Sequence, residues 1–254
     1  MSYLTAYNTI LRKEILRFIR IWVQTIFPPV ITTSLYLLIF GGIMGSRIGD
    51  MSGISYVKYI VPGVILMTII TNSYMNTVSS FFLAKFNHSI EELLVSPTPN
   101  WVILLGFISG GVARGLAVGF TVSIVAWVFV RFSIYSLSIT LLTTIMTSIL
   151  FSLMGFINAV FAKTFDDISI IPSFILMPLV YLGGMFYSIE ILPEFWRNIS
   201  QFNPIFYMVD SFRFGFLGVS SSPVYESLLF ILLAIILLGI ISLKLLKNGV
   251  NIRF

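Results

Sequence analysis

The 254-residue sequence contains no cysteine and a single histidine, His88. Without a thiol, the chain can form neither a disulfide nor a thiolate metal site. One imidazole gives no support for a histidine metal cluster or for a serine–histidine hydrolase within the membrane. No lysine follows a glycine, so the phosphate-binding P-loop is missing as well. We therefore expect no catalytic residue, no metal and no cofactor bound by this chain.

Charged residues are scarce, at 10%, whereas 57% of the residues are hydrophobic. Soluble domains carry about 25% charged residues, so the composition indicates an all-α polytopic membrane protein. We expect residues 1–22 to form a separate interfacial helix and residues 23–251 to form one transmembrane domain. The six predicted spans cover about residues 23–45, 59–83, 101–130, 133–162, 168–188 and 223–243.

The distribution of lysine and arginine predicts which side of the membrane the termini face. Six spans place both termini on one side, and assigning that side to the cytoplasm gives it nine cations against five outside. The predicted inner cations are Arg12, Lys13, Arg17, Arg20, Lys85, Lys163, Lys244, Lys247 and Arg253, and the outer ones are Arg47, Lys58, Arg131, Arg197 and Arg213. Because cytoplasmic loops are enriched in basic residues, we expect cytoplasmic termini. The net charge of +5 therefore needs no nucleic-acid partner to explain it.

Residues 1–22 have the pattern of an amphipathic helix. Its apolar stripe, at three- and four-residue spacing, consists of Leu4, Tyr7, Leu11, Ile15, Phe18, Ile19 and Trp22. The cations that fall largely on the other side are Arg12, Lys13, Arg17 and Arg20. Such a helix lies in the membrane interface with its cations among the lipid phosphates. A simpler alternative is a positive flank that only orients the first span.

A polar segment, residues 85–100, separates the second and third predicted spans. Ser89 is placed to cap a helix that has Glu91 and Glu92 in its first turn, and Pro97 helps to end that helix. About two turns of amphipathic helix are more than a simple connection between spans needs. We therefore expect this segment to contact another protein.

Arg114 is the one charge deep in a predicted span. In one hypothesis it contacts an anionic substrate or a lipid headgroup on a translocation path. In the other, it faces the helix bundle and bonds backbone carbonyls, or it reaches toward the interface. On the same span, Gly111, Gly115 and Gly119 repeat every four residues, which predicts close helix packing.

Three ordered pieces of the sequence resemble the type-2 ABC permease family, the membrane subunits of bacterial exporters for drugs, lipids and polysaccharides. They are the basic leader from Arg12 to Arg20, the segment from Tyr56 to Gly63, and the end of the fifth span with the region that follows it. The residues of this last region that carry the resemblance are Gly183, Gly184, Phe186, Pro193, Trp196, Asn203, Pro204 and Arg213. The resemblance implies short re-entrant helices there, dipping into the outer leaflet between spans five and six.

The polar segment looks like the coupling helix of this family, which docks on the ATP-binding subunit. The residues assigned to this role are His88, Ser89, Glu91, Glu92, Leu93, Leu94 and Pro97. Members of the family often carry Gly-Thr where this chain has His88-Ser89. The resemblance implies a half-transporter permease of the bacterial inner membrane that works as two copies, most simply a homodimer. It also implies that ATP and Mg²⁺ bind to a separate ATPase subunit and that the cargo is an exported lipid, glycan or amphipathic drug.

Two other functions are open to a polytopic membrane protein. A lipid-modifying enzyme within the membrane needs polar groups that converge at one depth, and only Arg114 qualifies. An ion-coupled secondary transporter usually needs ionisable residues within its spans or broken helices at the midplane. Because no carboxylate falls clearly within a predicted span, the sequence favours the permease.

Overall fold

The computed structural model describes residues 2–51, 53–249 and 251. Arg253 of the predicted cytoplasmic group, and residues 52 and 250 of the predicted transmembrane domain, lie outside the described residues. The described chain is helical apart from its connecting segments and one small antiparallel hairpin. This hairpin pairs β1 (Asp50–Met51) with β2 (Ile54–Ser55).

Five helices of the described chain are long and apolar enough to cross a membrane. The first consists of α2 (Trp22–Tyr36) and its π-helical continuation η1 (Leu37–Met44). The others are α4 (Tyr56–Phe86), α6 (Asn100–Val130), α7 (Leu137–Phe161) and α12 (Val224–Asn248). They cover the segments predicted as spans one to four and span six.

The segment predicted as the fifth span, residues 168–188, is helical only as far as Leu182. It consists of α8 (Asp167–Ile171), the π-helical η2 (Pro172–Leu176) and α9 (Met177–Leu182). Gly183 and Gly184 end the helix, and Gly184 has a left-handed φ of 73° that favours glycine. A helix over residues 167–182 rises about 24 Å, which is less than the roughly 30 Å of the hydrocarbon core.

Shorter helices complete the chain. Before and between the long helices lie α1 (Tyr3–Arg20), α3 (Gly45–Ile48) and α5 (Ser89–Val95). Between α9 and α12 lie the 3-10 helix η3 (Ile189–Ile191), α10 (Glu194–Gln201) and α11 (Pro204–Leu217). The short helices predicted after the fifth span are therefore present.

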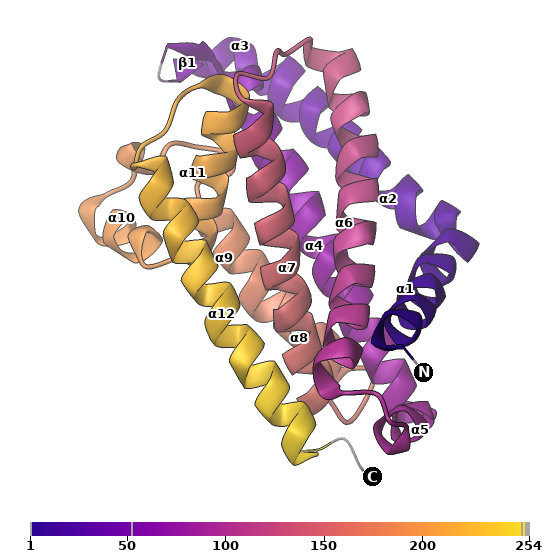
Figure 1. Cartoon of the computed structure of the whole chain (residues 1–254). Coiled ribbons are helices and arrows are strands. Elements are labelled where there is room, and N and C mark those ends of the chain that lie inside the picture. Colours follow the sequence, from indigo (N-terminus) through magenta and orange to yellow (C-terminus); the bar gives the residue numbers. More distant parts are fainter. Residues whose placement is uncertain (1, 52, 250, 252–254) are drawn as a thin grey trace.

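Helix α4 forms the centre of the bundle and packs against α6 and α7 (Figure 1). Of its most apolar stretch, 78% is buried, compared with 11% for α12. The predicted close packing of α6 is confirmed, because side chains on its glycine face would collide with neighbouring helices. A Cβ atom on Gly115 would meet Ser73 of α4, and one on Gly119 would lie 2.6 Å from Ile69.

The two ends of the bundle carry different elements (Figure 1). Helix α5, the start of α1 and the last turns of α12 lie at one end, which we call the α5 end. Helix α3 and the β1–β2 hairpin lie at the other, which we call the hairpin end. Both described ends of the chain are thus on the same side of the bundle.

Candidate functional site

Helix α5 follows α4 after a sharp turn at Asn87 and His88. His88 has a left-handed φ of 58°, which reverses the chain without a glycine. The prediction that Ser89 caps α5 is wrong, because Ser89 is the first residue of the helix and no side chain caps it. Its hydroxyl donates instead to the carbonyl oxygen of Ala84 in α4, at 3.1 Å. The turn therefore points Ser89 back toward α4 and fixes α5 to the end of that helix.

One face of α5 is buried against the bundle. Ile90 is fully buried, and the half-buried Leu93 and Leu94 pack against the hydrophobic core. Leu93 also anchors the end of the helix, since its carbonyl oxygen accepts a hydrogen bond from Ser96 Oγ at 2.6 Å. Of the predicted coupling residues, Leu93 and Leu94 thus attach α5 to the bundle and expose little of their side chains to solvent.

The other face of α5 is exposed and carries both charge and apolar surface. Glu92 and Pro97 are exposed, and the side chain of Val95 is 88% exposed. His88 Nδ1 lies 3.2 Å from Glu91 Oε1, so these two side chains form one polar edge of the same face. This face of α5 therefore combines one highly exposed apolar side chain with two carboxylates.

A buried lysine lies directly before this turn. Lys85 is 2% exposed, and its Nζ donates to the carbonyl oxygens of Val160 at 2.8 Å and Ala162 at 2.7 Å. These carbonyls are at the C-terminal end of α7, where the helix dipole favours a cation. Lys85 therefore joins the ends of α4 and α7 beside α5. The sequence placed Lys85 among the predicted cytoplasmic cations and at the start of the polar segment, and gave no sign that it is buried.

Helix α1 packs along α6 with a buried face formed by Ile10, Glu14 and Phe18. A Cβ atom on Gly106 would lie 2.5 Å from Ile10 Cγ2, and one on Gly110 would lie 2.5 Å from Glu14 Cβ. Only glycine at these two positions lets α1 come so close. The face that packs on α6 therefore differs from the predicted apolar stripe: only Phe18 belongs to both, while Leu4 and Ile19 of the stripe are exposed.

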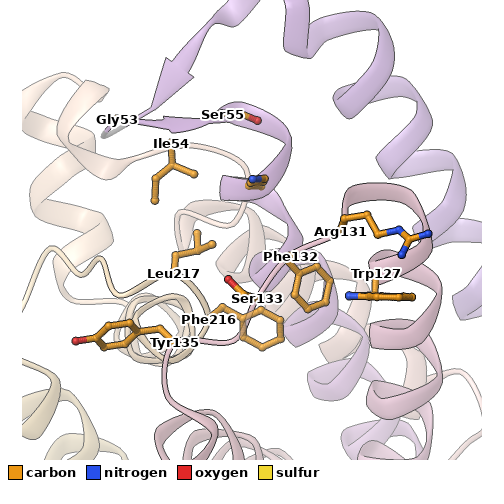
Figure 2. A pocket seen from close by; sticks show the side chains of 11 residues that line it. Gly53, Ile54, Ser55, Trp127, Arg131, Phe132, Ser133, Tyr135, Phe216 and Leu217 are labelled. Atoms are coloured by element: carbon orange, nitrogen blue, oxygen red, sulfur yellow. The ribbon is translucent and has the colours of Figure 1, made fainter.

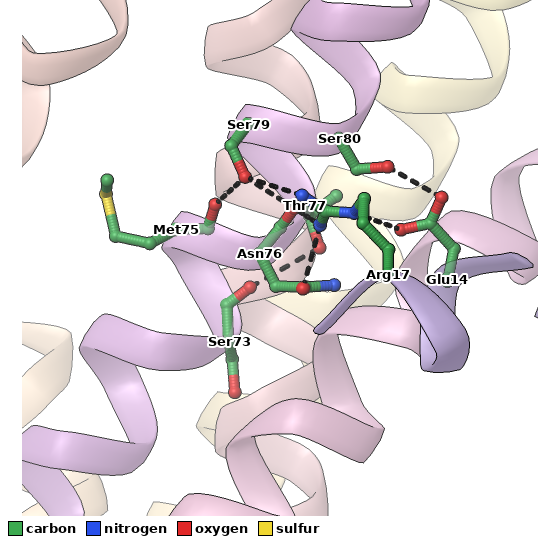
Figure 3. Close-up of polar contacts among 8 residues, drawn as sticks. All are labelled: Glu14, Arg17, Ser73, Met75, Asn76, Thr77, Ser79 and Ser80. Carbon is green, nitrogen blue, oxygen red and sulfur yellow. Dashed lines mark hydrogen bonds and ion pairs between the residues drawn. The ribbon is translucent and has the colours of Figure 1, made fainter. Parts of the chain in front are cut away.

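Glu14 and Arg17 connect α1 to α4 (Figure 3). Glu14 Oε1 accepts a hydrogen bond from Ser80 Oγ at 2.6 Å, and Glu14 Oε2 lies 3.6 Å from Arg17 Nε. Arg17 donates to the backbone oxygen and to Oδ1 of Asn76, both at 2.8 Å. Burial raises the pKa of Glu14 and lowers the pKa of Arg17.

The other predicted interfacial cations, Arg12, Lys13 and Arg20, are exposed on α1. Arg17 differs from them because it turns into the protein. The sequence analysis missed Glu14, although a signal was present. Glu14 stands four residues from both Ile10 and Phe18, at the spacing of a buried helix face.

The predicted outer residues Gly183, Gly184 and Phe186 form a compact segment against α4. A Cβ atom on Gly63 would collide with the backbone carbonyl of Met185, so the two backbones touch. Arg213, which is 3% exposed, donates to the carbonyl oxygen of Gly184 at 2.6 Å. Its guanidinium also lies 4.1 Å from the ring centroid of Tyr59. Phe186 stacks beside Phe40, with ring centroids 5.5 Å apart.

Asn203 and Pro204 begin α11. Asn203 Oδ1 accepts a hydrogen bond from the Ile205 N–H at 3.0 Å, and its Nδ2 donates to the carbonyl oxygen of Leu179 at 2.5 Å. Pro204 occupies the first turn, where its missing N–H is harmless. In the structure this predicted pair therefore begins α11, and Asn203 both caps the helix and connects it to α9.

Helix α10 starts after Pro193 and presents aromatic side chains outward. Trp196 is 46% exposed, and Phe195 and Phe202 are more exposed still. Arg197 donates to the carbonyl oxygen of Glu190 at 2.6 Å and so fastens α10 to η3. The predicted residues of this region therefore divide into a buried group around Arg213 and an exposed aromatic group around Trp196.

Arg114 lines a cavity of about 340 Å³. Polar side chains that line it include Gln24, Thr32, Thr71 and Asn72, from α2 and α4. Arg114 Nε is buried and has no hydrogen-bond partner among the described residues. The arrangement leaves a cation facing a largely apolar cavity that carries a few hydroxyl and amide groups. The carbonyl-bonded alternative finds no support in the part of the chain that the structure describes.

Comparison with known proteins gives consistent matches. The family described as ABC-2 type transporter matches residues 5–217. Inner membrane transport permease YadH of Escherichia coli (strain K12) is 52% identical over 251 residues, which cover 99% of this chain and 98% of that protein. Nodulation protein J of Neorhizobium galegae is 21% identical over 252 residues, covering 97% of this chain and 95% of that protein.

These matches agree with the five apolar helices of a multi-pass inner membrane protein. They also agree with the resemblance seen in the sequence, which extends from the leader to Arg213. The chain is the membrane-spanning permease subunit of an ATP-binding cassette transporter and belongs to the ABC-2 type transporter family.

Proposed function

We propose that two copies of this permease, most simply a homodimer, export a lipid, glycan or amphipathic drug with energy from a separate ATPase subunit. ATP and Mg²⁺ bind only to that subunit, which docks at the α5 end on the cytoplasmic side. The observation that carries the proposal is the exposed face of α5, which bears Glu92 and Val95. Helix α5 is attached to the end of α4, the most buried of the long helices. His88, Glu91 and Pro97 form the rim of this face.

The contacts of α5 explain how docking would move the bundle. Ile90 and Ser89 hold α5 against the end of α4, and Lys85 joins that end to α7. A displacement of α5 by the ATPase subunit is therefore passed to α4 and α7 together. A loosely attached loop would absorb the same displacement.

In this proposal α1 is the interfacial helix at the cytoplasmic membrane surface. Its exposed cations Arg12, Lys13 and Arg20 lie among the lipid phosphates. Arg17 instead bonds Asn76 of α4, so that any movement of α4 is shared with α1. The ATPase subunit would then act on two helices that both bear on α4.

The proposed topology has six spans and cytoplasmic termini. Residues 168–182 supply the fifth span, and the segment from Gly183 to Phe186 completes it on the outer side. The short helices η3, α10 and α11 then dip into the outer leaflet between spans five and six. The exposed aromatic residues Phe195, Trp196 and Phe202 support this placement, because aromatic side chains favour the membrane interface.

Arg114 is proposed to line the translocation path and to bind an anionic group of the cargo. Its cavity opens between α2, α4 and α9, where a second copy of the chain could complete the path. Arg114→Gln is expected to reduce export of an anionic cargo while the ATPase activity without cargo is unchanged. Arg114→Lys should retain more export than Arg114→Gln if charge, and not shape, is what the cargo needs.

The α5 assignment is tested with a pair of exposed substitutions, Glu92→Arg and Val95→Asp, in the assembled transporter. Because neither side chain packs in the core, the variant should reach the membrane normally. It should fail to retain the ATPase subunit during purification and should lose cargo-stimulated ATP hydrolysis.

The matched control is Glu194→Arg with Phe195→Asp on α10, an acidic and apolar pair at an exposed site on a different short helix. The control should retain the ATPase subunit. If the α5 variant keeps both the subunit and its stimulated hydrolysis, α5 is not the docking site.

A further inference from the structure

Two adjoining cavities lie toward the hairpin end of the bundle and share Trp127, Phe132 and Phe216 as lining residues. The first has a volume of about 570 Å³ and a mixed lining of apolar, aromatic and polar side chains that includes two cations (Figure 2). The second has a volume of about 540 Å³ and a lining that is almost entirely apolar. Both volumes are in the range of ligand sites, roughly 300–1,000 Å³.

The first cavity contains two cations, Lys58 and Arg131. The guanidinium of Arg131 lies 4.4 Å from the ring centroid of Trp127, a cation–π contact that holds it at the cavity (Figure 2). Arg131 also has a left-handed φ of 51° at the end of α6, where the chain turns. Within the described chain, neither cation lies within 4 Å of a carboxylate. The cavity therefore has a positive charge that no carboxylate among the described residues contacts.

The second cavity is a crevice between α6 and α7 that reaches the central helix at Ile65 and Ile69. Its few hydroxyl groups are used within their own helices. Ser123 donates to the carbonyl oxygen of Gly119 at 2.7 Å, and Thr144 donates to that of Thr140 at 2.8 Å. The crevice can therefore pack closely against a hydrocarbon chain, but it offers a polar ligand few hydrogen-bonding groups.

We propose that an anionic phospholipid binds across both cavities, with its phosphate between Lys58 and Arg131 and one acyl chain in the crevice between α6 and α7. Surrounding lipid is as apolar as the crevice, so burying the chain contributes little selectivity. The two cations supply the selectivity, as basic pockets do for anionic headgroups in other membrane proteins. Trp127 lies where the two cavities meet, as expected for an indole at the boundary between headgroups and acyl chains.

This lipid comes from the leaflet at the hairpin end, which is the outer leaflet in the proposed topology. The site does not depend on the docking of an ATPase subunit or on the nature of the cargo. Failure of the α5 experiment would therefore leave the lipid site intact, and failure of the lipid experiment would leave the docking proposal intact.

The experiment uses Trp127 as the reporter. The full chain with its other three tryptophans, Trp22, Trp101 and Trp196, replaced by phenylalanine is reconstituted in phosphatidylcholine vesicles. Phosphatidylglycerol or phosphatidylcholine with brominated acyl chains is then titrated in over the same range of mole fractions. Bromine quenches tryptophan fluorescence at contact, so the quenching of Trp127 reports which lipid occupies the crevice. Each variant is normalised to its own signal in unbrominated lipid.

Brominated phosphatidylglycerol should quench Trp127 at a mole fraction at least about fivefold lower than brominated phosphatidylcholine does, from the attraction of a surface cation for an anionic lipid. Replacing both cations, with Lys58→Gln and Arg131→Gln, should remove this preference. Glutamine at position 131 experiences the same left-handed backbone as arginine, and the normalisation to unbrominated lipid corrects for the lost contact with Trp127. The control Arg47→Gln removes an exposed cation that does not line either cavity and should keep the preference.

A second pair of variants tests the crevice itself. Ser123→Phe fills the space beside Trp127 and should weaken quenching by both brominated lipids. Thr121→Phe is the matched control, because Thr121 makes the same type of hydroxyl bond within α6 but does not line the crevice. Equal quenching of the original chain by both lipids would mean ordinary annular lipid and would overturn the proposal. Absence of quenching by either lipid would mean that a second protein copy covers the crevice, and would overturn it as well.

Discussion

Replacing Arg17 with methionine should release α1 from the rest of the bundle. Arg17 supplies the only cation within 4 Å of Glu14 in the described chain, and it bonds Asn76 and Ser79 of α4. Glu14 has no solvent exposure. In the Arg17→Met variant its carboxylate would be buried with only the hydroxyl of Ser80 as a partner.

The expected cost follows from the burial of this pair. Removing one partner of a buried ion pair typically costs 3–5 kcal/mol, and the side chain of Arg17 is 23% exposed, so we expect about 3 kcal/mol. This corresponds to an increase of roughly 100-fold in the population with α1 undocked. The chain otherwise folds normally, because the packing of α4, α6 and α7 does not involve this pair.

The absence of cysteine makes the undocked population measurable by thiol labelling. Ile10→Cys places a single thiol on the buried face of α1, 5% exposed, and its labelling by a maleimide requires α1 to leave α6. Asn8→Cys on the exposed face of the same helix corrects for the reactivity of the thiol. The ratio of the two labelling rates should rise about 100-fold when Arg17→Met is added, by the free energy above.

The effect should also depend on pH. Burial raises the pKa of Glu14, so the docked state binds this proton more tightly than the undocked state does. Protonation therefore favours docking below the ordinary glutamate pKa of about 4.3, and this stabilisation is lost as the pH rises through the raised value. Acidification should slow the labelling of the Arg17→Met variant, since neutral Glu14 needs no counter-charge.

A double variant distinguishes the unpaired carboxylate of Glu14 from the lost packing of Arg17. Glu14→Gln combined with Arg17→Met removes both charges and should restore most of the docking, because an uncharged pair leaves no buried carboxylate. If the double variant labels as fast as Arg17→Met alone, the effect comes from lost packing of the arginine side chain and not from the unpaired carboxylate.

Two further predictions concern the hairpin end and the turn before α8. Gly63→Ala forces a Cβ atom onto the backbone of Met185 and should lower the free energy of unfolding by about 1–3 kcal/mol. Thermal unfolding in detergent measures this, with Gly239→Ala, which meets no atom within 4 Å, as the control. N–H groups of Lys163 and Thr164 lower the pKa of Asp167. Asp167→Asn should therefore lower the melting temperature at neutral pH, and this difference from the original chain should disappear as the pH falls below about 4. A difference that stays constant with pH would contradict the prediction.

Hydropathy and glycine spacing predicted much of the bundle. Long apolar runs identify helices because a membrane span must satisfy its own backbone hydrogen bonds. The four-residue repeat of Gly111, Gly115 and Gly119 correctly predicted where α6 packs closely. The family resemblance implied the short helices that follow residue 182.

The sequence could not predict contacts made by polar side chains between distant helices. Lys85 reads as an ordinary loop cation, and its burial depends on where α7 happens to end. Ser89 reads as a helix cap, yet the left-handed turn at His88 directs its hydroxyl to α4. Such contacts follow from tertiary geometry, which local spacing does not specify.

Helix α4 contacts other elements near both of its ends, so these elements are displaced with it when it tilts. At one end Lys85 bonds the last carbonyls of α7, and near the other Gly63 touches the backbone of Met185. An uninterrupted helix of 31 residues is about 46 Å long, so a tilt of about 5° displaces its far end by about 4 Å. A small rotation at the α5 end would therefore become a side-chain-sized shift beside the aromatic residues at the opposite membrane surface. The α5 end and the hairpin end would then be coupled through the helix itself, without a separate chain of side-chain contacts.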